Sequence, residues 1–431
     1  MNKLCSLVLL GFLMWGADAR AEFVVEVTRG QTQAIPIAVV PFASAAETAA
    51  SFDVAQMISE DLARSGRFKT MDVKDMIDQP HAGANIAFDD WRRLNNDYMV
   101  VGSLQSTAAD RFNITYELYN VLTRQRLLGF QISANRPGLR LASHQIADAV
   151  FEKILGIRGA FSTRIAYIAV LGHVPTKNYE LVVADADGEN PHVVTQSKEP
   201  LMSPAWSPDG GRLAYVSFED RLSTIYVQDL KSGERRRISA HAGVNQAPAW
   251  SPDGKKMALT LSTRDGNLDV YIMDLDSQAL TRITDDPGID TEPQWSKDGQ
   301  SLYFTSDRAG GPQIYKVGIR PGDKPRRMTF QGSYNARPRI SPDESQMSFV
   351  TQDEGGYRIA TMDLRGHGDM QVLTKGPFDV SPSYAPNGAV IIYATRDRGR
   401  GVLALVSADG RVQQRLVASE GELQEPAWAP F

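Results

Sequence analysis

The sequence predicts an α/β N-terminal domain followed by an all-β six-bladed β-propeller, and three observations support this fold class. The stretch SPAWSPDGGRLAYVS, which begins at Ser203, recurs along the second half of the chain. The first part of the chain lacks this repeat and mixes strand and helix patterns. The length of 431 residues exceeds that of one ordinary domain. A repeated unit of this size indicates blades rather than a single sheet.

Each copy of the repeat predicts one four-stranded blade. The copies share a proline two residues before a tryptophan or another large residue, and these prolines are 44 or 45 residues apart: Pro204, Pro248, Pro293, Pro338, Pro382 and Pro426. In the first copy, Ser207–Gly210 has serine first, proline second and glycine fourth, as a type I turn favours. Further β-branched or aromatic runs follow, so the unit holds four strands, which is the pattern of a propeller blade.

The two ends of the repeat region predict how the ring closes. The run RIAYIAV from Arg164 begins a blade that lacks an innermost strand, whereas EPAWAPF from Glu425 is an innermost strand that lacks a blade. If these segments pair, residues 163–431 form a closed ring of six blades, which covers the sheet edges. Tryptophans of the repeat such as Trp206 and Trp250 are expected to pack one blade on the next, because large apolar groups at repeated positions form core.

Residues 34–160 predict a separate α/β domain. The run AIPIAVVPF from Ala34 is typical of a buried strand, and Ser51 is positioned to cap a helix that Gly66 ends. Further strand patterns follow, and ASHQIADAVFEKILG closes the domain as a helix. Ahead of the domain, residues 22–33 begin with an alternating strand, which either adds itself to another sheet or folds back on its own domain.

The first residues predict export. Lys3 precedes an apolar run, and small residues follow it with cleavage sites after Ala19 and Ala21, as in a signal peptide over residues 1–21. The only cysteine, Cys5, lies before this run, so it is not the lipidated cysteine of a lipoprotein. No later stretch approaches the roughly 20 apolar residues of a membrane span. The net charge of −5 gives no reason to expect nucleic-acid binding.

The sequence contains no recognisable catalytic motif. The six histidines include no pair at metal-ligand spacing, and no Gly-x-Ser-x-Gly elbow occurs. His144 lies in a helix pattern and is expected to be a surface or packed histidine rather than a base. The run DADGEN from Asp185 looks like part of a calcium loop, but it lacks the closing glutamate and matches a turn of the repeat. We expect a monomer that is not an enzyme and has no metal site or cofactor.

The combination of these features resembles the TolB family of the Tol-Pal system. It consists of the N-terminal strand leading into IPIAVVPF, the small α/β domain, the SPAWSPDG repeats and the final PAW, and it covers the chain from Glu22 to Phe431. The resemblance implies a Gram-negative periplasmic adaptor that binds the peptidoglycan-associated lipoprotein Pal and the inner-membrane protein TolA. It also implies roles in outer-membrane integrity and in constriction at cell division, contacts with other outer-membrane proteins, and exploitation by colicins.

Two sites follow from this resemblance. The loops that lead into the innermost strands open onto one propeller face, and their residues differ between repeats, as expected of a surface that recognises a partner. The implied Pal-binding surface comprises Met202, Ser203, Asn245, Gln246, Ala247, Thr291, Glu292, Ala336, Arg337, Val380, Ser381 and Glu425. The implied TolA-binding segment covers residues 22–33 and includes Glu22, Phe23, Val24, Val25, Glu26 and Val27.

Three functions remain open from the sequence. An adaptor binds proteins without turnover, a ligand-binding propeller takes a small molecule or glycan in its central channel, and a hydrolase turns over esters or peptides. The missing catalytic motifs argue against the hydrolase, and the few polar side chains of PAWS and PQWS weaken the ligand-binding alternative. For the adaptor we add the hypothesis that lipoprotein binding biases the docking of the N-terminal segment.

Overall fold

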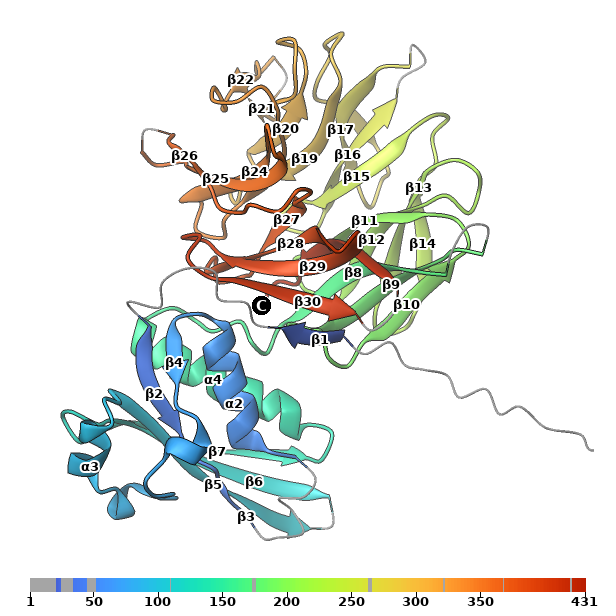
Figure 1. The fold of residues 1–431 in the computed structure, drawn as a ribbon. Coiled ribbons are helices and arrows are strands. Elements are labelled where there is room, and N and C mark those ends of the chain that lie inside the picture. The colour runs from blue at the N-terminus through green and yellow to red at the C-terminus, as the bar shows by residue number, and fades with distance from the viewer. Residues whose placement is uncertain are drawn as a thin grey trace, which may run out of the picture.

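The protein consists of an α/β domain and a β-propeller (Figure 1). The structure, a computed structural model, describes residues 21–24, 34–44, 52–108, 110–172, 176–262, 266–320, 322–366, 368–418 and 421–431. The strands in these ranges form seven sheets, one in the α/β domain and six in the propeller. No helix of the described ranges is long and apolar enough to cross a membrane. The predicted fold class is confirmed, whereas the predicted signal peptide lies outside the described residues except for Ala21.

A mixed sheet in the order β4-β2-β5-β6-β7 forms the α/β domain. β2 runs parallel to β4 and β5, β3 pairs in parallel with β5, and β5, β6 and β7 form an antiparallel meander. The strands are β2 (Ile35–Val39), β3 (Ala43–Ser44), β4 (Phe68–Thr70), β5 (Tyr98–Ala108), β6 (Arg111–Asn120) and β7 (Gln125–Asn135). The helices are α2 (Val54–Arg64), α3 (Phe88–Arg93) and α4 (Leu139–Leu155), with 3₁₀ turns at Val73–Asp75 and Gly83–Asn85.

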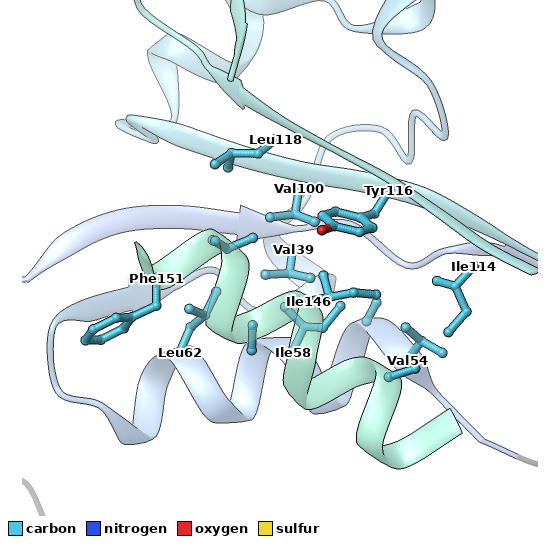
Figure 2. Close-up of a cluster of buried hydrophobic side chains, with 14 of the residues drawn as sticks. Val39, Val54, Ile58, Leu62, Val100, Ile114, Tyr116, Leu118, Ile146 and Phe151 are labelled. Atoms are coloured by element: carbon cyan, nitrogen blue, oxygen red, sulfur yellow. The ribbon is translucent and has the colours of Figure 1, made fainter. Parts of the chain in front are cut away.

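Apolar side chains cover both faces of this sheet. Successive residues of β2 point to opposite faces, so that Val39 faces α2 and α4, whereas Ala38 joins the cluster around Trp91 of α3. Figure 2 shows the larger cluster, in which Ile58 of α2 and Ile146 of α4 pack against Val39. The two long helices therefore lie side by side on one face, where they also reach the propeller.

Helix α2 begins later than the sequence predicts. Ser51 lies outside the described residues, and the Asp53 side chain accepts the backbone N–H of Gln56 at 2.9 Å. Asp53 is therefore the N-cap, because its carboxylate satisfies a donor that the first helical turn leaves free. Gly66 follows the helix with a φ of +67°, as its predicted role in ending the helix requires.

The propeller contains six antiparallel sheets, five of four strands and one of five, and the innermost strands carry the repeated prolines. The first blade contains β31 (Glu422–Trp428), β8 (Arg164–Leu171), β9 (Asn178–Asp185) and β10 (His192–Ser197). The second contains β11 (Leu201–Trp206), β12 (Arg212–Ser217), β13 (Thr224–Asp229) and β14 (Arg235–Ser239). The third contains β15 (Asn245–Trp250), β16 (Lys256–Ser262), β17 (Leu268–Asp274) and β18 (Leu280–Arg282).

The remaining three blades repeat this order. The fourth contains β19 (Asp290–Trp295), β20 (Ser301–Ser306), β21 (Gln313–Gly318) and β22 (Arg326–Arg327). The fifth contains β23 (Asn335–Ile340), β24 (Gln346–Asp353), β25 (Gly356–Asp363) and β26 (Met370–Val372). The sixth contains β27 (Val380–Tyr384), β28 (Val390–Asp397), β29 (Arg400–Ser407) and β30 (Gln413–Ala418), and β1 (Ala21–Val24) adds a fifth strand beside β30.

The ring closes between its first and last strands, as predicted. β31 pairs antiparallel with β8, with Glu422 opposite Val170 and Trp428 opposite Ile165. The repeated tryptophans join the blades: the indole N–H of Trp250 donates to the Ala205 carbonyl of the preceding blade at 3.1 Å. Trp206 and Trp295 make the same contact one blade earlier and one blade later. The predicted packing role of these tryptophans is therefore seen in their hydrogen bonds as well as in their burial.

Candidate functional site

Six residues, one at the start of each innermost strand, surround the propeller axis. They are Ser203, Ala247, Glu292, Arg337, Ser381 and Glu425, and we call them the channel ring. The ring leads into a central channel with a volume of about 520 Å³, which the innermost strands enclose. Each innermost strand ends at a turn, and the turn of the sixth blade contacts the α/β domain, where the Asn387 amide donates to the Arg158 carbonyl at 3.0 Å. The channel ring therefore lies on the face away from the α/β domain.

The backbone of the channel ring is strained in the same way in every blade. All six residues, which lie within the described ranges, have φ between +51° and +57° although none is glycine. A left-handed conformation costs a non-glycine residue about 1–2 kcal/mol. The pairing register shifts at each of these points, as at a β-bulge, which re-aims the side chain. Because the same strained backbone conformation occurs in all six blades around an open channel, it indicates a functional surface rather than a local irregularity of one loop.

One arginine links two carboxylates across the channel ring. The Arg337 Nε donates to Glu292 Oε1 at 2.6 Å, and its Nη2 lies 3.6 Å from Glu425 Oε1. Burial alone would lower the pKa of Arg337, but the carboxylates of Glu292 and Glu425 raise it above its ordinary value. Arg337 also donates to the Ser381 hydroxyl. The charged side of the ring is therefore held together by partly buried ion pairs.

Exposed apolar side chains stand on the loops around the channel ring. Phe330 is 74% exposed, Ile289 46% and Phe378 37%, and each lies just before an innermost strand. Leu222, in the hairpin between β12 and β13, is 55% exposed on the same side. We call these four residues the apolar rim. Large apolar side chains that are exposed on one face are a feature of surfaces that interact with other proteins.

Most of the sequence-predicted residues on this face meet at the channel. The residues that line it are Met202, Ser203, Gln246, Ala247, Thr291, Glu292, Arg337, Ser381 and Glu425. Asn245 and Ala336 are instead buried in the blades, and Val380 is half-buried against apolar neighbours. The buried Asn245 accepts the backbone N–H of His241 at 3.0 Å, so it fixes its own loop. Sequence position alone did not separate these loop anchors from the channel residues.

The predicted N-terminal segment is described only in part. Glu22, Phe23 and Val24 lie in β1, whose backbone pairs with β30 from Ala21 opposite Ala418 to Val24 opposite Arg415. Val25, Glu26 and Val27 lie outside the described residues. Of the two arrangements left open by the sequence, the structure has the strand added to another sheet, the edge of the sixth blade.

A buried charged cluster, which no sequence pattern indicated, joins the α/β domain to the first blade. His144 of α4 contacts Asp61 of α2, with 2.6 Å between His144 Nδ1 and Asp61 Oδ2. His144 Nε2 lies 3.7 Å from Asp187 Oδ2, in the turn between β9 and β10. Arg64 and Arg140 contact the same carboxylates. We call these five residues the interdomain cluster.

The charges of the interdomain cluster indicate a structural contact between the domains rather than a metal site. Ligand atoms of Asp61, His144 and Asp187 lie within 4.8 Å of one another, a spacing that could hold a metal ion. Arg64 and Arg140 already neutralise these carboxylates, so a cation would have to displace them. Burial alone would lower the pKa of His144, but the hydrogen bond and charge of Asp61, together with Asp187, raise it above 6.5. His144 is therefore a packed histidine in an ion-pair network, one of the two roles expected from the sequence.

Comparison with known proteins assigns the family. Residues 151–431 match the TolB beta propeller domain, and residues 23–127 match the TolB amino-terminal domain. The Tol-Pal system protein TolB of Nitrosococcus oceani is 52% identical over 431 residues, which cover 99% of this chain and 98% of the relative. That of Xanthomonas campestris pv. campestris is 46% identical over 409 residues, covering 94% and 93%. The crystal structure of TolB from Acinetobacter baumannii superposes with a TM-score of 0.88 at 39% identity, covering 96% of this chain and 100% of that one.

The fold and the channel ring define a two-domain β-propeller protein whose propeller axis is surrounded by a strained backbone and charged side chains. The two matching domain families and the relatives that cover nearly the whole chain identify the family to which it belongs. The chain belongs to the TolB family of Tol-Pal system proteins. Proteins of this family are non-catalytic components of that system.

Proposed function

We propose that this protein is a periplasmic adaptor of the Tol-Pal system, which binds the lipoprotein Pal on the channel-ring face and TolA through residues 22–33. In this role it maintains outer-membrane integrity and supports constriction of the outer membrane at cell division. Other outer-membrane proteins and colicins are further expected partners. The observation that carries the proposal is the channel ring, because it combines backbone strain, ion pairs and an apolar rim on one open face.

The geometry of this face suits a protein partner better than a small substrate. The apolar rim stands outside the channel, where a docked protein would cover it and exclude water from the ion pairs within. Arg337 and Glu292 are pre-positioned by their mutual contact at 2.6 Å, so little side-chain ordering is needed on binding. The α/β domain contacts the turn at the other end of the innermost strand of the sixth blade and leaves this approach open.

The N-terminal segment suits a partner that recognises an extended strand. β1 adds to β30 by main-chain pairing, which is a mode by which extended peptides also bind other sheets. The segment can therefore pair either with its own propeller or with TolA. Binding of Pal biases this choice if the sixth blade changes its edge geometry when the channel ring is occupied.

Calorimetric titration with the periplasmic domain of Pal tests the proposed face. We expect Glu292→Lys to weaken binding, because it reverses a charge held by Arg337. Phe330→Ser provides a second variant that leaves the ring intact, since Phe330 is 74% exposed. The matched control is Glu234→Lys, an exposed charge reversal on the turn between β13 and β14, away from the ring. Unchanged affinity in both ring-side variants would refute this assignment of the face.

Removal of residues 22–33 tests the second site and the coupling between the two. The deletion should abolish binding to the periplasmic part of TolA, because the segment itself is the proposed ligand. It should also alter the affinity for Pal if docking of β1 on β30 and occupancy of the channel ring are linked. Equal Pal affinity with and without residues 22–33 would refute the coupling between the N-terminal segment and the channel ring, but not the adaptor role.

A further inference from the structure

A second layer of side chains lines the central channel, two residues past each member of the channel ring. It comprises Ala205, Ala249, Gln294, Arg339, Ser383 and Ala427, all of which are described and line the channel. Five of these six positions are neutral. Arg339, on β23 of the fifth blade, places a positive charge in this layer.

The guanidinium of Arg339 makes no ion pair with any residue that the structure describes. Its single hydrogen bond to a described residue is a local one, from Nη1 to the carbonyl oxygen of Pro338 at 2.9 Å. No carboxylate of the described chain lies within 4.0 Å of it, unlike the guanidinium of Arg337. The other N–H groups of Arg339 are therefore directed at channel solvent rather than at protein acceptors.

The nearest carboxylates are already engaged by other donors. Glu292 Oε2 accepts the backbone N–H of Arg337 at 2.9 Å and the hydroxyl of Thr305 at 3.0 Å. Glu425 accepts the backbone N–H of Ser203 and faces Arg337 on its other oxygen. Arg337 therefore spans the ring and contacts both glutamates, and Arg339 has no carboxylate partner among the described residues that line the channel.

The position of Arg339 makes its charge costly. It is half-buried among prolines and tryptophans of the innermost strands. Burial lowers the pKa of Arg339 below its ordinary value, even though the charge of Glu292 opposes this effect. An anion that reached the guanidinium would replace lost hydration by a charge-assisted hydrogen bond, which is stronger than a neutral one.

We propose that Arg339 forms a carboxylate-binding subsite in the central channel, which takes an aspartate or glutamate side chain of the protein that docks on the channel ring. The identity of the donor as a docking protein rests on the proposed function, whereas the subsite itself does not. A carboxylate matches the planar fork of a guanidinium. Its single charge also suits a channel that holds Glu292 and Glu425, which would repel the second charge of a phosphate. The volume of about 520 Å³ leaves room for such a side chain.

Two capped amino acids that differ in charge test the subsite without any partner protein. Binding of N-acetyl-glutamate amide and of N-acetyl-glutamine amide is followed by the fluorescence of the tryptophans that line the channel, such as Trp206 and Trp250. We expect the glutamate compound to bind more tightly than the glutamine compound, and Arg339→Gln to remove the difference. Equal binding of both compounds to the unaltered protein would overturn the subsite, as would a preference that survives in Arg339→Gln.

The chain offers matched controls for this substitution. Glutamine occurs at the equivalent position of the fourth blade, Gln294, so Arg339→Gln places in the fifth blade a residue that the repeat already accommodates. Arg124→Gln removes an arginine of the α/β domain that is 55% exposed and should leave the preference unchanged. A loss of preference in Arg124→Gln would show a general charge effect and would overturn the assignment to Arg339.

Titration with the Pal domain then identifies the source of the carboxylate. We expect Arg339→Gln to weaken Pal binding by roughly 10- to 100-fold, the range for loss of a hydrogen bond between charged groups. Equal affinity of both forms for Pal would overturn the docking protein as the donor. If Pal bound neither form while the glutamate compound still required Arg339, the proposed function would fail and the subsite would stand.

Discussion

Removal of the Asp61 charge is expected to weaken the attachment of the α/β domain to the propeller. Asp61 is fully buried, and its carboxylate meets His144 at 2.6 Å and the guanidinium of Arg64. Asp61→Asn keeps the shape of the side chain but leaves both cations without their buried partner. Breaking a buried ion pair in this way costs about 3–5 kcal/mol, and the lower end applies here because the amide still offers one acceptor. The corresponding fall in the melting temperature of the α/β domain is roughly 10 °C.

The loss of stability caused by Asp61→Asn should depend on pH, because it involves the protonation of His144. The pKa of His144 in the folded protein is raised above 6.5, so its protonated form contributes stability that is fully present below 6.5. This contribution is lost as the pH rises through the raised folded-state value. Asp61→Asn removes the main partner of the imidazolium, so the difference in melting temperature from the unaltered protein should be larger at pH 6 than at pH 8.

Differential scanning calorimetry at the two pH values measures both effects. Asp53→Asn on the same helix is the matched control, because Asp53 is an exposed N-cap and asparagine caps a helix equally well. A penalty below about 1 kcal/mol would contradict the reasoning, since that is the range of an exposed ion pair. An identical penalty at pH 6 and pH 8 would show that the His144 contact carries none of it.

Three further perturbations test the propeller. Deletion of residues 425–431 removes most of β31, and the open ring should melt at a lower temperature than the intact protein; an unchanged melt would refute closure by this strand. Trp250→Ala removes a buried indole and its hydrogen bond to the Ala205 carbonyl, and urea unfolding should show that the free energy of unfolding falls by about 3–5 kcal/mol. A fall of less than about 1 kcal/mol would contradict the role of Trp250 between blades. Asp290→Ala removes the two contacts of 2.8–2.9 Å between Arg308 and a fully buried carboxylate, and urea unfolding should show that the free energy of unfolding falls by about 3 kcal/mol. An unchanged free energy of unfolding would show that this ion pair does not stabilise the propeller.

The regular part of the fold was predictable because each blade repeats the same local chemistry. The spacing of the prolines gave the blades, and the unpaired EPAWAPF segment gave the closing strand. The predicted N-cap of α2 was Ser51, whereas the observed N-cap is Asp53. Both residue types are good N-caps, and only the geometry of the turn decides between them.

The placement of the channel residues was predictable, whereas their contacts were not. Residues just before each repeated proline had to face one end of the ring, and most of them line the channel. The positive φ values and the contact of Arg337 with Glu425 arise only after the blades meet, so no local pattern announces them. Asn245 was placed on the surface because it lies where a loop leads into an innermost strand, but its amide is used inside the loop.

The interdomain cluster could not be predicted for a related reason. Asp61, His144 and Asp187 come from two helices and a propeller turn that are far apart in the sequence. The turn itself was correctly recognised from DADGEN, and a turn of that composition needs no partner to explain it. Its carboxylates acquire their role only when the domains are placed together.

The backbone of the channel ring is nearly six-fold symmetric, because the same left-handed residue precedes the same proline in every blade. Its side chains break that symmetry, with charges at Glu292, Arg337 and Glu425 and small neutral groups at the other three positions. A protein approaching along the propeller axis would meet six equivalent angles on the backbone alone, whereas the charges single out one of them. If a partner binds on this face as proposed, the charges of the ring would therefore select one orientation of that partner about the propeller axis, relative to the α/β domain on the far side.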